Sequence, residues 1–147
     1  MPLYYMDSTA LVKRYSRERG TSIVNTLIHK SGKQVVVGTP SVLELYAVLA
    51  LKTRQGEITR DDWYSLIVKF ECEAAQGLFQ QVAPTAQTYV LAKELIVEHP
   101  TLTATQALHL ALAGELKPHR VTLVTCDREL LELCRPHGLT PSNPEED

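Results

Sequence analysis

The chain has few cysteines and no long hydrophobic run, and both features limit the cellular compartments in which we expect the protein. The 147 residues include three cysteines but no C-x-x-C pair, so one cysteine would stay unpaired in any disulfide scheme. No apolar segment approaches the roughly 18 residues of a membrane span, and the N-terminus lacks the basic and then apolar pattern of a signal peptide. We therefore expect a cytoplasmic protein with free thiols and no membrane segment.

The chain also has no large excess of positively or negatively charged residues. Lys and Arg number 15 against 17 Asp and Glu, so the net charge is -2. This balance excludes nucleic-acid binding by overall charge alone, although it allows a local basic rim. With 44% hydrophobic residues, the length suits one domain with one core. We predict a single domain over residues 1–140 and a polar C-terminal tail over 141–147 that frays.

Segments with strand and helix patterns alternate along the chain, which favours an α/β fold with a mainly parallel sheet. Strands are predicted at 3–6, 34–37, 78–82 and 121–125, with a short last strand near 138–140. Helices are predicted at 8–17, 21–30, 41–54, between Thr59 and Gly77, and at 86–98, 103–115 and 128–134.

Three acidic residues follow three of these strands. Asp7 comes directly after the first strand, Asp127 after the fourth, and Glu44 after the second strand and a Thr-Pro-Ser turn. Each acid also has a local explanation. Glu44 completes an S-x-x-E capping box with Ser41, and the two aspartates precede helices that they could cap. Because the carboxyl ends of parallel strands share one edge, we nevertheless expect the three acids to open towards one crevice.

Clustered carboxylates repel one another unless a cation compensates, and this predicts a metal site. Mg²⁺ prefers a few carboxylates, retained waters and phosphate oxygens, and such a metal can activate water to attack a phosphodiester. Zinc has little support, because the five histidines, at 29, 99, 109, 119 and 137, show no H-E-x-x-H spacing.

Four motifs in order resemble those of PIN-domain ribonucleases, including VapC-type toxins of toxin–antitoxin pairs. They are YMDSTALVK at 5–13, SVLE at 41–44, ALHLALA at 107–113 and LVTCDRELL at 123–131. The resemblance implies a three-layer α/β/α sandwich, dependence on Mg²⁺ or Mn²⁺, an RNA substrate, a possible antitoxin partner and a homodimer. It also implies metal binding by Asp7, Glu44 and Asp127, with Ser8 and Thr125 as supporting hydroxyls.

One position departs from the pattern. The third motif of the family normally begins with Asp, and this chain has Gln106 there. Gln106 removes one charge and offers a carbonyl oxygen, and it also completes a T-x-x-Q capping box with Thr103. Either three carboxylates suffice for one metal and for cleavage, or a second metal is lost together with activity.

These alternatives define the hypotheses. The first is a metal-dependent endoribonuclease in which Lys13 contacts an RNA phosphate. The second is a catalytically weakened PIN domain that binds RNA or a protein. A third, a phosphoacceptor receiver-type domain, requires two adjacent acids after the first strand, and only Asp7 is present. His109, one turn after Gln106, is interpreted as a partly buried structural residue.

Overall fold

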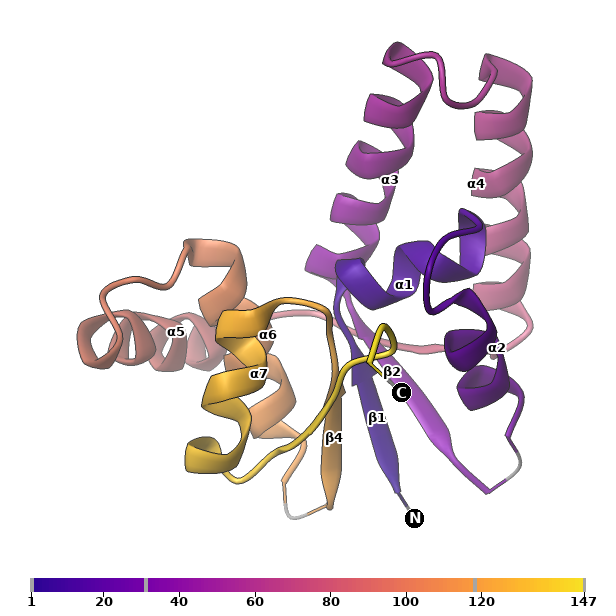
Figure 1. Ribbon diagram of the computed structural model, residues 1–147. Helices are drawn as coiled ribbons and strands as arrows, with labels where there is room; N and C mark the ends of the chain where they lie inside the picture. Colours follow the sequence, from indigo (N-terminus) through magenta and orange to yellow (C-terminus); the bar gives the residue numbers. More distant parts are fainter. Residues whose placement is uncertain (1, 31, 118, 147) are drawn as a thin grey trace.

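A parallel β-sheet forms the centre of the computed structural model, which describes residues 2–30, 32–117 and 119–146 (Figure 1). Its five strands lie in the order β3-β2-β1-β4-β5, and every neighbouring pair is parallel. The strands are β1 (Leu3–Met6), β2 (Gln34–Gly38), β3 (Gln80–Val82), β4 (Val121–Val124) and β5 (Thr140–Ser142). This arrangement confirms the predicted α/β class and places β1, which leads to Asp7, in the middle.

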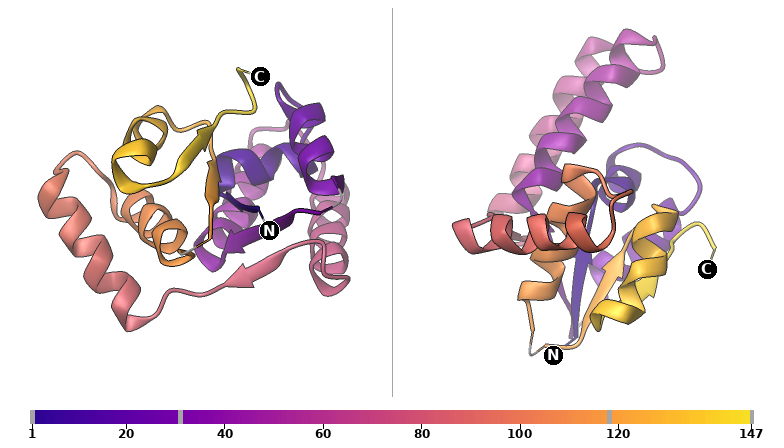
Figure 2. Two further views of the ribbon diagram at one scale, coloured as in Figure 1. Left: turned by 90° about the horizontal axis from the view of Figure 1, so that it is seen from below. Right: turned by 90° about the vertical axis from the view of Figure 1, so that its left-hand side faces the viewer.

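Helices cover both faces of the sheet, which makes a three-layer α/β/α sandwich (Figure 2). One face carries α1 (Ser8–Tyr15), α2 (Thr21–His29), α3 (Thr39–Arg54) and α4 (Arg60–Ala75). The other carries α5 (Ala86–Glu98), α6 (Ala104–Glu115), α7 (Arg128–Cys134) and the short 3₁₀ helix η1 (Arg135–His137). Helices α3 and α4 project beyond the sheet as a hairpin (Figure 1).

The core consists of two apolar clusters, one on each side of the sheet, because successive strand side chains point to opposite faces. Tyr5 and Leu123 pack with α5, α6 and α7, whereas Met6 and Val124 pack with the helices of the other layer. The three inner strands, β1, β2 and β4, are largely buried on both faces, as expected for a parallel sheet between helices. The three cysteines are free thiols, as predicted.

The start of α3 differs from the prediction, because this helix begins at Thr39 with Gly38 as its N-cap. The expected Thr-Pro-Ser turn is instead the first helical turn, where the fixed φ of Pro40 is compatible with a helix. The Ser41 hydroxyl donates to the Met6 carbonyl oxygen at 3.1 Å. The predicted capping box between Ser41 and Glu44 is therefore wrong, and Glu44 is available for other contacts.

The C-terminal segment is more ordered than predicted. Strand β5 extends through Ser142, whose carbonyl oxygen accepts the Thr125 N–H at 3.0 Å. Further along, the Glu145 carboxylate binds the Lys13 ammonium at 2.7 Å. The expected fraying from residue 141 is thus wrong for residues 141 and 142, and residue 147 lies outside the described part. Within the described residues, no helix has the length and apolarity needed to cross a membrane.

Candidate active site at the carboxyl edge of the sheet

Asp7 is a buried carboxylate at the end of the central strand, with 2% of its surface exposed. Its Oδ1 accepts hydrogen bonds from the Thr9 hydroxyl at 2.6 Å and from the Ala10 N–H at 3.2 Å. Its Oδ2 accepts from the Thr125 hydroxyl at 2.5 Å, across from the end of β4. Burial raises the pKa of Asp7, while a nearby His109 and these hydrogen bonds oppose the rise. The Thr125 hydroxyl therefore helps to hold the Asp7 carboxylate in place.

Asp127 and Gln106 meet at the starts of two helices. Asp127 caps α7, because its Oδ1 accepts the backbone N–H groups of Glu129 and Leu130. Gln106 completes the predicted capping box of α6, in which its Oε1 accepts the Thr103 N–H at 2.8 Å. The same side chain donates from Nε2 to Asp127 Oδ2 at 2.8 Å. Gln106 therefore faces the acidic edge through its amide N–H, with its carbonyl oxygen already in the cap.

Glu44 is linked to the other side of the sheet by a buried histidine. His109 Nε2 lies 2.7 Å from Glu44 Oε1, and His109 Nδ1 lies 2.9 Å from the Tyr5 hydroxyl. The ring of His109 is buried, as the sequence interpretation expected, but it also contacts a candidate ligand. Glu44 itself has 34% of its side chain exposed. The chain Tyr5–His109–Glu44 holds this carboxylate at the rim of the site.

Tyr5 and Thr9 are contributors that the sequence analysis missed. Thr9 connects two strand ends, because its hydroxyl donates to Asp7 and accepts the Cys126 N–H at 2.8 Å. The position of Thr9 two residues after Asp7, where a side chain can bond back to the helix cap, is the signal that could have found it. No comparable local signal exists for Tyr5, since its partner His109 is 104 positions away.

Lys13 and Ser8, two further predicted site residues, are both buried in the structure. The Lys13 ammonium is buried and bound by Glu18 at 2.9 Å and by Glu145 at 2.7 Å. An RNA phosphate would have to displace one of these carboxylates, so the structure gives no support to Lys13 as an open phosphate contact. Ser8 is buried next to Asp7 as the first residue of α1.

A family model described as "PIN domain" matches residues 4–136. The chain belongs to that family. It is 26% identical over 147 residues to "Ribonuclease VapC47" of Mycobacterium tuberculosis (strain CDC 1551 / Oshkosh), covering 97% of each chain.

Two solved structures share the PIN fold with this chain. One is VapBC2 from Rickettsia felis bound to a DNA fragment from their promoter, with a TM-score of 0.68 at 15% identity over 96% of this chain and 98% of that one. The other is VapC20 of M. tuberculosis, a sarcin-ricin loop cleaving toxin, with a TM-score of 0.64 at 12% identity over 86% and 92%.

The three carboxylates of this PIN domain differ in how many lone pairs they retain for a cation. An ionised carboxylate has about four acceptor positions. Asp7 and Asp127 each accept three hydrogen bonds from the protein, whereas the Glu44 carboxylate, among the described residues, has a hydrogen bond only with His109. Asp7 and Asp127 can therefore each offer about one further position, on Oδ2, and Glu44 about three. This all-oxygen set suits a hard divalent ion.

The carboxylates do not form one tight group, however. Ligands of a single Mg²⁺ lie within roughly 4.2 Å of each other, twice the Mg–O distance. Among the described residues, Asp7, Glu44 and Asp127 are not a set whose oxygens all lie within 4.8 Å. One or two of them can bind an ion directly, and the rest through water, which is the way that Mg²⁺ is usually held.

Proposed function

We propose that this PIN domain is a metal-dependent endoribonuclease that hydrolyses RNA phosphodiesters and is the toxin of a toxin–antitoxin pair. The observation that carries the proposal is the buried Asp7 carboxylate at the centre of the carboxyl edge, bound by two hydroxyls. Burying an ionisable group costs free energy, and such groups are concentrated at functional sites. The names of the similar proteins, a ribonuclease and a loop-cleaving toxin, support the substrate class.

Asp7, Glu44 and Asp127 would hold Mg²⁺ or Mn²⁺. When bound, such an ion lowers the pKa of water and stabilises charge on a phosphodiester. The protein's own contribution is to position the acids, and each has its own support. Thr9 and Thr125 hold Asp7 by hydrogen bonds, while His109 holds Glu44.

Gln106 provides the third support, because its amide N–H holds Asp127. An aspartate at this position would add a charge and repel Asp127, so Gln106 exchanges one negative charge for a hydrogen bond. We infer that the site works with a single ion. The Gln106–Asp127 bond also favours a second candidate function, a weakened PIN domain that binds RNA or protein without cutting.

A protein partner is supported by the exposed apolar side chains of the projecting hairpin. Leu51, Tyr64 and Val68 are large hydrophobic residues that face solvent on α3 and α4. Exposed apolar groups gathered on one part of the surface are typical of interaction sites. The similar VapBC structures are complexes, and we propose that an antitoxin and a second copy of the chain cover such surfaces here.

Cleavage of labelled single-stranded RNA tests the first function. With Mn²⁺ or Mg²⁺ the native chain should cut, and EDTA or Asp7→Asn should abolish cutting. Asp61→Asn is the matched control, because Asp61 is an exposed residue in the first turn of α4. Metal-independent cleavage, or full activity of the Asp7 variant, would refute the mechanism.

Substitution of Gln106 separates the two functions. If the native chain cuts RNA, the single-ion site is active, and Gln106→Asp only changes the rate of a cleavage activity that already exists. If the native chain binds RNA and only the Gln106→Asp variant cuts, the weakened domain is the correct description. Gln87→Asp serves as the control, because Gln87 is an exposed glutamine in the first turn of α5.

A further inference from the structure

A second group of metal-binding side chains lies outside the acidic edge. Glu98, His99 and His137 place one ligand atom each within 4.8 Å of one another, and among the described residues no other such group of three appears. His99 Nε2 lies 3.1 Å from His137 Nε2 and 3.6 Å from Glu98 Oε1. We propose that these three residues form a transition-metal site, with Zn²⁺ as its ion.

The two measured separations fit a tetrahedral ion. Zinc–nitrogen and zinc–oxygen bonds of about 2.0–2.1 Å require ligand atoms roughly 3.3–3.4 Å apart along each edge of a tetrahedron. The observed 3.1 Å and 3.6 Å lie on either side of this value, within a few tenths of an ångström. Small side-chain rotations would therefore suffice for binding.

Local backbone restraints place both histidines. His99 is the C-cap of α5, where its N–H bonds to the Leu95 carbonyl oxygen at 2.8 Å, and Pro100 prevents the helix from continuing. His137 ends η1, and Gly138 then turns the chain with a φ of 76°. The ligands thus come from two turns whose geometry is set by proline and glycine, which lowers the cost of ordering them.

The electrostatic setting favours a cation. The C-terminal end of a helix carries partial negative charge, and α5 ends at Glu98, which adds a full one. Imidazole ligands select zinc and similar metals, whereas Mg²⁺ prefers oxygen. This group therefore differs in metal preference from the all-oxygen acidic edge.

A hydrogen bond between the two rings is the simplest alternative explanation for the short nitrogen–nitrogen distance. The ring planes meet at 80°, and one ring would carry the shared proton. Such a bond does not involve Glu98, however, whose carboxylate lies 3.6 Å from the same His99 nitrogen. A bound ion would use all three groups and would displace the shared proton.

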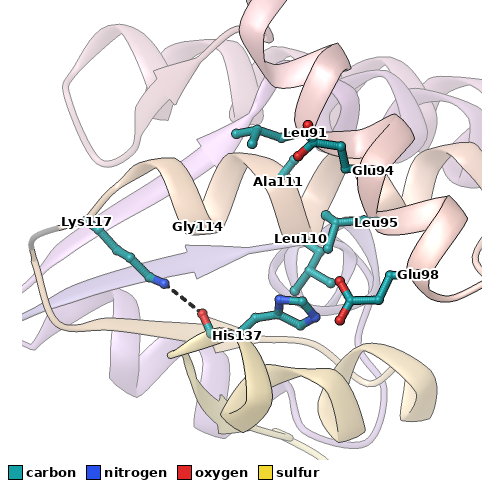
Figure 3. A pocket seen from close by; sticks show the side chains of 9 residues that line it. All are labelled: Leu91, Glu94, Leu95, Glu98, Leu110, Ala111, Gly114, Lys117 and His137. Carbon is teal, nitrogen blue, oxygen red and sulfur yellow. Dashed lines mark hydrogen bonds between the residues drawn. The ribbon is translucent and has the colours of Figure 1, made fainter.

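The proposed site adjoins a cavity of about 290 Å³ that Glu98 and His137 line together with Leu91, Leu110 and Lys117 (Figure 3). The Lys117 ammonium donates to the His137 carbonyl oxygen at 2.9 Å, which holds η1 beside the cavity. Three protein ligands leave the fourth position of a tetrahedral zinc for water or a small ligand. The ion would tie the end of α5 to the turn before β5.

Calorimetric titration with Zn²⁺ tests the proposal by measuring the zinc affinity of the native chain and of the His99→Gln and His137→Gln variants. Loss of a residue that only hydrogen-bonds to a metal ligand costs roughly 10–100-fold in metal affinity. Loss of an imidazole that binds the ion directly should therefore cost at least about 100-fold in zinc affinity. His29→Gln is the matched control, because His29 is an exposed histidine at the end of α2, and it should bind zinc as the native chain does.

Nuclear magnetic resonance of the histidine rings gives a direct reading on the native protein. Zinc should shift the ring nitrogen signals of His99 and His137 together, and Mg²⁺ should leave them unchanged. Unshifted ring signals would mean a hydrogen-bonded pair only and would overturn the proposal. Glu98→Gln, at a largely exposed side chain, provides a variant whose fold does not depend on the substitution.

Discussion

Replacing Asp7 by asparagine should stabilise the metal-free protein even though it removes the central ligand of the proposed site. Asparagine has nearly the same shape. Its carbonyl oxygen can still accept from Thr9 and Ala10, and its amide can donate to the Thr125 hydroxyl oxygen. The substitution therefore keeps these contacts. It removes a charge that is poorly hydrated, because only 2% of the surface of Asp7 is exposed.

The size of the effect follows from that desolvation. Each unit by which folding raises the pKa of a carboxyl group costs about 1.4 kcal/mol when the group is ionised. Imperfectly compensated buried polar groups typically cost about 1–3 kcal/mol, and we expect Asp7→Asn to increase the free energy of unfolding by this amount near neutral pH. For a chain of this length, 1 kcal/mol corresponds to roughly 2–4 °C in Tm.

The advantage should depend on pH in one direction. Burial raises the pKa of Asp7 in the folded state above its unfolded value, so the folded protein holds the proton more tightly. Stability due to this group is fully present below the unfolded pKa and is lost as pH rises through the folded pKa. The native chain and the asparagine variant should thus converge below about pH 4, where Asp7 is protonated in both states.

Urea unfolding in the presence of a chelator measures this directly, at neutral pH and again near the unfolded pKa of aspartate. Asp61→Asn should show no comparable gain, since Asp61 is exposed. An Asp7→Asn variant that is less stable than the native chain at neutral pH, or an advantage that persists unchanged in acid, would refute the reasoning.

Three further substitutions test the supports of the site. Gly38→Ala should destabilise the fold by about 1–3 kcal/mol in thermal unfolding, because a Cβ there would lie 2.3 Å from the Tyr5 hydroxyl; an unchanged Tm would contradict this packing. Tyr5→Phe removes the bond to His109 and should cost about 1 kcal/mol. It should lower kcat more than it raises KM in RNA cleavage, and equal kinetics would exclude a positioning role. Lys13→Met should change global stability by less than about 1 kcal/mol, because Glu18 and Glu145 are both partly exposed and can turn to solvent. Amide exchange over residues 143–146 should nevertheless speed up, and unchanged exchange would show that the ion pair does not anchor this segment.

Local patterns in the sequence were sufficient to predict the alternation of strands and helices and the positions of the acids after the strands. Asp7 and Asp127 cap α1 and α7, and Thr103 caps α6 in a capping box with Gln106, because capping depends on residues about three positions apart. Parallel pairing then brings the ends of β1 and β4 together, as expected for strands with buried, apolar patterns.

Only the tertiary structure decided which side chains support the acids. The partners of Glu44 and Asp127 lie 65 and 21 positions away, and nothing in the local pattern selects His109 or the Gln106 amide. The same holds for Lys13, whose charge binds Glu145 from the far end of the chain. Propensity and periodicity act over one or two turns, whereas hydrogen bonds and ion pairs depend on which surfaces meet when the layers pack. The sequence alone therefore predicted an acidic edge, and the fold determined how each acid is held.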